Sequence, residues 1–80
     1  MMNMKAYILI TAKPGTTENI LKAIMNLKEV NVILADSVYG RFDAVVVIEA
    51  PDIKALSEMV YKMIGGHPDI THTETLITLF

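Results

Sequence analysis

The sequence predicts an α+β sandwich, in which two helices cover one face of a four-stranded antiparallel sheet. Four short stretches are continuously apolar or alternate with polar residues, and in two longer ones apolar residues recur every three or four positions, in the order strand, helix, strand, strand, helix, strand. The two halves also resemble each other, since ILITAKPG precedes the first helical stretch and VVVIEAPD precedes the second. With right-handed crossovers, this order gives the ferredoxin-like βαββαβ arrangement.

The first half begins with a strand over residues 6–12, which is rich in β-branched and aromatic residues and ends at a Pro-Gly breaker. A helix follows, with Thr16 or Thr17 as its N-cap and Glu18 in the first turn, where an acidic group suits the helix dipole. Its predicted apolar face consists of Ile20, Leu21, Ile24 and Leu27.

Two further strands are predicted on either side of a turn. Residues 30–39 alternate, and Asp36 interrupts them, which indicates a bulge or a sheet edge. The turn occupies residues 40–43. Residues 44–50 are almost continuously apolar, as is typical of a central strand.

The second helix begins after Asp52, which is its predicted N-cap, and ends at Gly65-Gly66. Its apolar stripe consists of Ile53, Leu56, Val60, Met63 and Ile64. Residues 71–80 alternate again and form the last predicted strand.

The composition excludes several classes of function. The chain has 80 residues, no cysteine and a net charge of −2. Disulfides and thiolate metal sites are therefore excluded, and a nucleic-acid surface would require clustered lysine and arginine. No apolar run reaches the roughly 20 residues of a membrane span, and the N-terminus lacks the features of a signal peptide. We therefore expect one soluble cytoplasmic domain that binds neither membranes nor nucleic acid directly.

Both faces of the predicted sheet are apolar. The alternating sets are Tyr7 and Leu9 against Ile8 and Ile10, and Val45 and Val47 against Val46 and Ile48. Because helices would cover one face only, the other would expose an apolar patch that soluble monomers seldom tolerate. The sequence therefore predicts a dimer whose sheets pack face to face.

Two polar segments are candidates for a binding site. Gly40 and Asp43 suit a hairpin turn, but a carboxylate at the start of a buried strand also needs a partner, which would be Arg41 or the ammonium group of a ligand. In the last strand, Thr71, Thr73 and Thr75 are expected on one face. They indicate either β-propensity alone or a row of hydroxyls that can donate and accept hydrogen bonds.

His72 and Glu74 favour a different function, that of a small dimeric α/β-barrel enzyme of the oxygenase or isomerase type. Such enzymes place a histidine or an acid in a closed cavity beneath the helices. Two ligands without a third are a weak metal signal, so we expect no metal, no cofactor and no catalytic residues.

The turn Gly40-Arg41-Phe42-Asp43, the apolar strand after it and the segment THTETL at 71–76 occur together at the spacing of the βαββαβ order. This combination resembles the C-terminal effector-binding domain of Lrp/AsnC-type transcription regulators, the RAM domain. The resemblance covers residues 5–80. An ACT-like regulatory module shares the fold and the ligand class, but its subunits pair side by side, and the two apolar sheet faces favour stacking.

The resemblance implies a domain that is not an enzyme and that binds an amino acid or a similar small effector between subunits. Its residues Gly40, Arg41, Phe42 and Asp43 would line the site, with Thr71, Thr73 and Thr75 nearby. It also implies a homodimer that assembles to an octamer or decamer. Regulators of this family carry an N-terminal helix-turn-helix domain, for which no room precedes the first strand. We therefore expect a stand-alone RAM-like domain over residues 1–80, which could join full-length Lrp/AsnC regulators in mixed oligomers.

Overall fold

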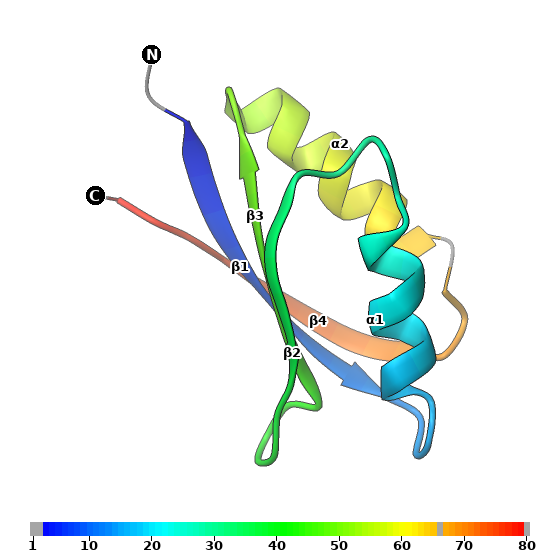
Figure 1. The fold of residues 1–80 in the computed structure, drawn as a ribbon. Coiled ribbons are helices and arrows are strands. Elements are labelled where there is room, and N and C mark those ends of the chain that lie inside the picture. Colours follow the sequence, from blue (N-terminus) through cyan, green and yellow to red (C-terminus); the bar gives the residue numbers. More distant parts are fainter. Residues whose placement is uncertain (1–2, 66, 80) are drawn as a thin grey trace.

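The computed structural model describes residues 3–65 and 67–79. Its elements follow the predicted βαββαβ order, and Figure 1 shows both helices on the same side of the sheet. The elements are β1 (Met4–Ala12), α1 (Thr17–Met25), β2 (Val32–Ser37), β3 (Ala44–Ala50), α2 (Ile53–Gly65) and β4 (Ile70–Ile77). The predicted ferredoxin-like sandwich is therefore confirmed.

The strands lie side by side in the order β2-β3-β1-β4, and every neighbouring pair is antiparallel. The strands β1 and β3 are central, whereas β2 and β4 form the two edges. Ile8 in β1 lies opposite Val46 in β3 and Thr75 in β4, so these three side chains share one face of the sheet. The pairing of β1 with β3 and β4 therefore shows which residues of these two strands lie on the same face of the sheet as a given residue of β1.

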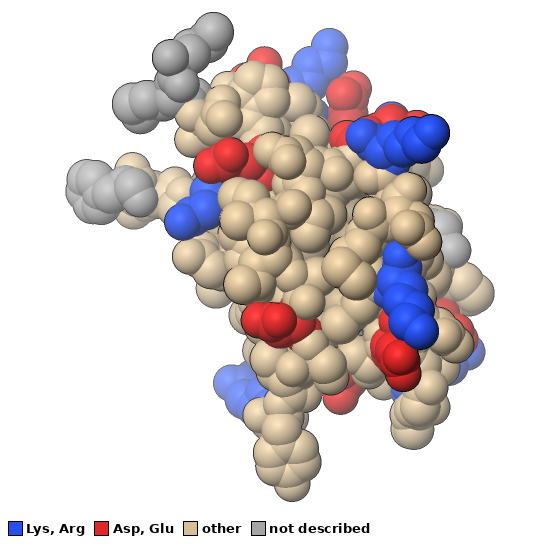
Figure 2. Space-filling view, in the orientation of Figure 1, with Lys and Arg blue, Asp and Glu red and all other residues tan. Residues whose placement is uncertain are grey.

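Charged side chains are scattered over the surface in Figure 2. Lysine and arginine alternate there with acidic and uncharged residues, and they form no basic patch on the side that is shown. That side offers no concentrated positive charge for a phosphate backbone. In the described part of the chain, no helix is long and apolar enough to cross a membrane.

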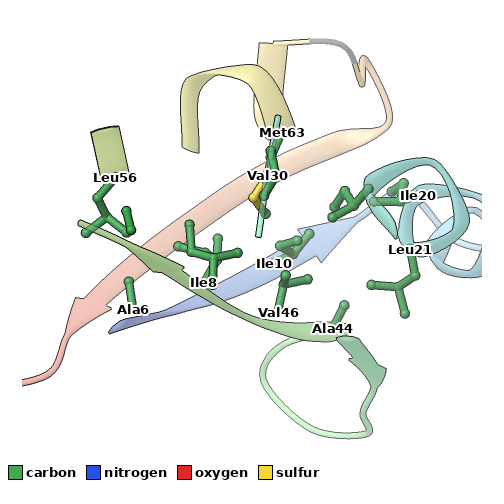
Figure 3. Close-up of a cluster of buried hydrophobic side chains, with 13 residues drawn as sticks. Ala6, Ile8, Ile10, Ile20, Leu21, Val30, Ala44, Val46, Leu56 and Met63 are labelled. Carbon is green, nitrogen blue, oxygen red and sulfur yellow. The ribbon is translucent and has the colours of Figure 1, made fainter. Parts of the chain in front are cut away.

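The core lies between the helices and the sheet face that carries Ile8 (Figure 3). Its largest fully buried side chains are Ile8, Ile10, Ile20, Ile24, Val46, Ile48, Leu56 and Met63. Ile20, Leu21 and Ile24 are confirmed on the buried face of α1, whereas Leu27 packs against the cluster from beyond the end of this helix. In α2 the predicted stripe differs at one end, because Ile53 is 51% exposed.

The starts of the two helices differ. The carboxylate of Asp52 accepts a hydrogen bond from the N–H of Ala55 at 2.8 Å, so its predicted role as the N-cap of α2 is confirmed. Thr16 occupies the N-cap position of α1, but its hydroxyl donates to the carbonyl of Lys13 at 2.7 Å and caps no helical N–H. Gly65 is the last residue of α2, and the predicted end at Gly66 lies outside the described residues.

A β-bulge lies in the edge strand β2. Val32 pairs with Ile48 and Leu34 pairs with Val47, so Ile33 is an extra residue. Val32 and Ala35 pack against the core, while Leu34 lies opposite Val47 on the other face. The simple alternation predicted for this strand is therefore wrong beyond Val32. The predicted edge position of Asp36 is confirmed.

Truncation of the central strand tests this account of the core. We expect Ile8→Ala to lower the free energy of unfolding by about 2–5 kcal/mol, because it leaves a cavity between β1 and both helices. Ile33→Ala removes the same atoms from a side chain that is 51% exposed, and its effect should stay within about 0.5 kcal/mol. Urea unfolding at one protein concentration measures both; equal losses would contradict the assignment of the core.

Candidate functional site

The turn between β2 and β3 projects beyond the end of the sheet (Figure 1). Gly40 adopts φ +145°, a conformation that residues with a side chain rarely adopt. The N–H of Val38 donates to the carbonyl of Asp43 at 2.9 Å and closes the turn. Tyr39, just before the glycine, is fully exposed. The glycine therefore allows a tight reversal that leaves an aromatic side chain in solvent.

Asp43 fastens this turn to β1. Its carboxylate Oδ2 accepts a hydrogen bond from the N–H of Ala12 at 2.8 Å, and its own N–H donates to the carbonyl of Ile10 at 2.8 Å. The carboxylate is partly buried and therefore loses part of its hydration. The hydrogen bond from Ala12 compensates for this loss. The partner expected from the sequence, Arg41, instead has its guanidinium carbon 6.0 Å from the ring centroid of Phe42.

Thr71 reaches the same end of β1 from the opposite side. Its hydroxyl donates to the carbonyl of Thr11 at 3.1 Å. The register of β4 shifts here, since His72 pairs with Thr11 and Ile70 pairs with Ala12, which makes Thr71 the extra residue of a bulge. Asp43 and Thr71 therefore flank the last two residues of β1 and hydrogen-bond their backbone. This is the point at which the structure brings the two predicted segments together.

Thr73 and Thr75 do not reach that point. They lie opposite Ile10 and Ile8, so they share the helix-covered face of the sheet. Thr75 lines a hollow of about 250 Å³ between α2 and β4. The other lining residues are Ile53, Leu56, Ser57, Val60 and Ile77. The expected row of three hydroxyls is interrupted, because the bulge removes Thr71 from the alternation.

This hollow was not expected from the sequence. Ile53, Leu56 and Val60 have the three- and four-residue spacing of a core-facing stripe, and that spacing contains no signal for a gap. The exposure of Ile53 and Ile77, at 51% and 40%, shows that the edge strand β4 does not cover the first turns of α2.

The pair of His72 and Glu74 lies on the open face of the sheet, opposite Thr11 and Leu9. Nε2 of His72 is 3.7 Å from Oε2 of Glu74, and their side chains are 63% and 47% exposed. The pair is therefore at the surface, outside any closed cavity beneath the helices. Among residues 3–65 and 67–79, no third His, Asp or Glu joins it to make a group that could hold a metal ion.

The open face has an apolar centre with a charged border. The register places Tyr7, Leu9, Leu34, Val45, Val47 and Leu76 on it. Leu34 is 42% exposed and Leu76 is 53% exposed, so the patch faces solvent in the single chain. Lys5 and Glu49 lie opposite each other at one end, and Asp36 and Glu74 lie on the edge strands. This face has the pattern of an interface, with an apolar core and a polar rim.

Residues 5–79 match the family model described as the Lrp/AsnC ligand binding domain. The chain belongs to this family. As an Lrp/AsnC domain, it is related to regulatory modules that bind ligands. No curated protein matches its sequence.

Some solved structures that resemble this chain have about its length, and others are about twice as long. FFRP-DM1 is 28% identical with a TM-score of 0.84, and the match covers 95% of this chain and 99% of that one. Escherichia coli AsnC is 26% identical with a TM-score of 0.83, and the match covers 96% of this chain but 51% of that one. A transcriptional regulator from Neisseria meningitidis, solved as a complex with L-Met, is 16% identical with a TM-score of 0.77 over 96% of this chain and 50% of that one, and it shows the shared fold.

The role of Asp43 in the fold can be separated from a role in ligand binding. Asp43→Ala leaves the N–H of Ala12 without its acceptor and should cost about 1–3 kcal/mol of unfolding free energy. Asp43→Asn keeps an acceptor oxygen and should retain most of the stability while it loses the charge. Urea unfolding of both variants measures the difference; an alanine variant as stable as the wild type would refute the structural role of this bond.

Proposed function

We propose that this Lrp/AsnC domain binds a small effector, an amino acid or a close analogue, at boundaries between subunits, and that effector binding controls its oligomeric state. It acts in this way on transcription regulators, and it carries out no catalysis of its own. The family match over residues 5–79 supports effector binding. The complex of the N. meningitidis regulator with L-Met supports an amino acid as the ligand class.

The observation that carries the proposal is the open apolar face of the sheet. The helices bury one face of the sheet. On the other face, the side chains of Tyr7, Leu34 and Leu76 are exposed to water. A second copy of the face would remove this area from water, at about 25 cal/mol per Å² of apolar surface. We therefore propose a homodimer with stacked sheets, in which His72 and Glu74 lie on the packed face.

The effector site of this proposal is the end of β1 beside the turn. Backbone N–H groups near Gly40 can donate to a carboxylate. The hydroxyl of Thr71 donates to the carbonyl of Thr11, and its oxygen can still accept a hydrogen bond from the ligand. Asp43 holds Ala12 through Oδ2, and Oδ1 is the oxygen that would accept the ammonium group of an amino acid in a charge-assisted bond. Arg41 and Phe42 border this position and would contact the ligand side chain.

Larger assemblies extend the proposal. Dimers would combine into an octamer or decamer, and copies of this domain would enter mixed oligomers with full-length Lrp/AsnC regulators. Contact with DNA would then come from the partner chains, which is consistent with the scattered charges of this one.

A charge in the centre of the open face tests the dimer. Val45→Lys should shift the mass measured by light scattering toward the 8.9 kDa of one chain. An apolar interface offers no partner for the charge of the lysine, so its burial there is unfavourable. Met25→Lys adds the same charge at the exposed end of α1, on the helix side, and should leave the dimer intact. A wild-type protein with the mass of one chain would contradict the stacked dimer.

A thermal-shift screen against the common amino acids at millimolar concentration tests the effector. A ligand at 100 times its Kd adds about 2.7 kcal/mol to the native state, which gives a clear rise in Tm. We expect a selective shift with one or a few amino acids and its loss in Asp43→Asn. A shift that Asp43→Asn retains in full would move the site away from the turn, and no shift with any amino acid would contradict this ligand class.

A further inference from the structure

The pair of His72 and Glu74 is a polar group of the open face that the proposed effector site does not use. Both residues lie on the edge strand β4, where Nε2 of His72 is 3.7 Å from Oε2 of Glu74. They belong to the face that the proposed dimer covers, so association removes them from water. A carboxylate that loses its hydration needs a partner, and histidine supplies a positive charge only when it is protonated.

Residues of the open face form rows that cross all four strands. One row has an apolar centre and a carboxylate on each edge strand; it consists of Glu74 in β4, Leu9 in β1, Val45 in β3 and Asp36 in β2. The next row is apolar throughout and consists of Leu76, Tyr7, Val47 and Leu34. In the row after that, Lys5 of β1 lies opposite Glu49 of β3.

These rows determine which two-fold arrangement of stacked sheets is favourable. With the axis parallel to the strands and between β1 and β3, each row faces its own reversed copy, and β2 lies over β4 of the second copy. Leucine then faces leucine at both ends of the apolar row, and Lys5 of one copy faces Glu49 of the other. With the axis across the strands and between the first two rows, Asp36 and Glu74 would face the apolar row, which offers their charges no partner.

The favourable arrangement brings Asp36 of the second copy to the pair of His72 and Glu74. Aligned sheets lie about 10 Å apart and cross at about 30°, which displaces facing residues at the edges by about one position. Asp36 of the second copy therefore remains beside Glu74, the carboxylate that His72 approaches. The two carboxylates repel each other, and a protonated imidazole next to them offsets one of the two negative charges. The two-fold axis creates this group twice in the dimer.

The remaining charges of the open face lie toward its ends. Lys5 is separated from the row of carboxylates by four residues of β1, or about 13 Å, which exceeds the screening length at physiological salt, and it lies opposite Glu49. At the other end, Asp43 accepts a hydrogen bond from the backbone of β1. Lys13 follows that end of β1, and in the described part of the chain it makes no ion pair with either carboxylate of the row. His72 is therefore the titratable group that responds to the facing carboxylates near neutral pH.

We infer that the stacked dimer takes up protons on His72 when it forms, so that it is tighter in mildly acid than in mildly alkaline solution. This inference rests on the dimer of the proposed function and adds a pH-dependent control to it. Histidine ordinarily changes its charge near about pH 6.5, where aspartate and glutamate stay ionised. The imidazolium is stabilised more strongly between two carboxylates in the dimer than on the exposed surface of one chain. This contribution is present at low pH and is lost as the pH rises through the range in which the dimer releases the proton.

The dissociation constant of the dimer, measured by sedimentation equilibrium at about pH 6 and about pH 8, tests the inference. Uptake of one proton per dimer changes Kd about tenfold per pH unit. We expect Kd to be roughly tenfold or more higher at the upper pH. All buffers contain EDTA, so that divalent ions do not neutralise the carboxylates in place of the proton.

Three variants identify the groups involved. His72→Gln should show the weak wild-type affinity of the upper pH at both pH values. Asp36→Asn should tighten the dimer at the upper pH and reduce the pH dependence. In one chain Asp36 and His72 lie on opposite edges, about 14 Å apart, so this effect requires a contact between copies. His67→Gln is the matched control and should retain the full dependence, because His67 lies in the loop before β4, outside the paired strands.

Three results would overturn the inference while leaving the dimer in place: a wild-type Kd equal at both pH values, a pH dependence that His72→Gln retains, or one that Asp36→Asn leaves unchanged. Wild-type protein with the mass of one chain at both pH values would overturn the dimer itself. The thermal-shift screen judges the effector separately from both.

Discussion

The register of the sheet depends on β1, which pairs with β3 on one side and β4 on the other. Among the described residues, the side-chain hydrogen bonds that join distant parts of the chain all end on its backbone. The N–H of Ala12 donates to the carboxylate of Asp43, and the hydroxyls of Thr71 and Thr78 donate to the carbonyls of Thr11 and Lys5. Each bond reaches a peptide group near one end of β1 and ties that end to another segment of the chain. The candidate site is located at one of these ends.

The same strands supply two apolar surfaces with different roles. One set of side chains packs under α1 and α2 and makes the core of a single chain. The alternate set includes Val47, which its own neighbours already cover to 6% exposure, and Leu76, which remains half exposed. A domain of this size buries a modest core, and stability that depends on association makes folding and assembly concentration-dependent. In the proposed dimer, any influence on the interface would therefore also act on the fold.

The sequence was sufficient to predict the order of elements, because periods of two and of about 3.6 residues are strong and separated by Pro and Gly signals. It also predicted Asp52 as an N-cap and an apolar second face. It did not predict the bulges at Ile33 and Thr71, since an extra residue in a strand leaves no distinct pattern. One inserted residue moves every later side chain to the opposite face, and this is why the alternation in β2 and the threonine row in β4 differ from expectation.

The candidate site shows the same limit. The sequence identified Asp43 as a carboxylate in need of a partner. This prediction needs only one position, because a charged group at the start of a buried strand loses hydration whatever its partner is. The partner is a backbone N–H 31 residues away, and a backbone donor has no sequence signature. The hollow beside Thr75 was equally hidden, because it results from how far β4 extends under α2.

The positions of the two bulges have a consequence for how copies of this chain avoid growing into fibres. Both lie on edge strands, Ile33 in β2 and Thr71 in β4. A flat edge with free N–H and C=O groups would template the addition of further strands without end, and a bulge disrupts the ladder and twists the edge away. A contact through a sheet face, in contrast, covers that face, so that no further copy can bind to it. The two bulges therefore make both edges of this sheet poor templates for the addition of further strands.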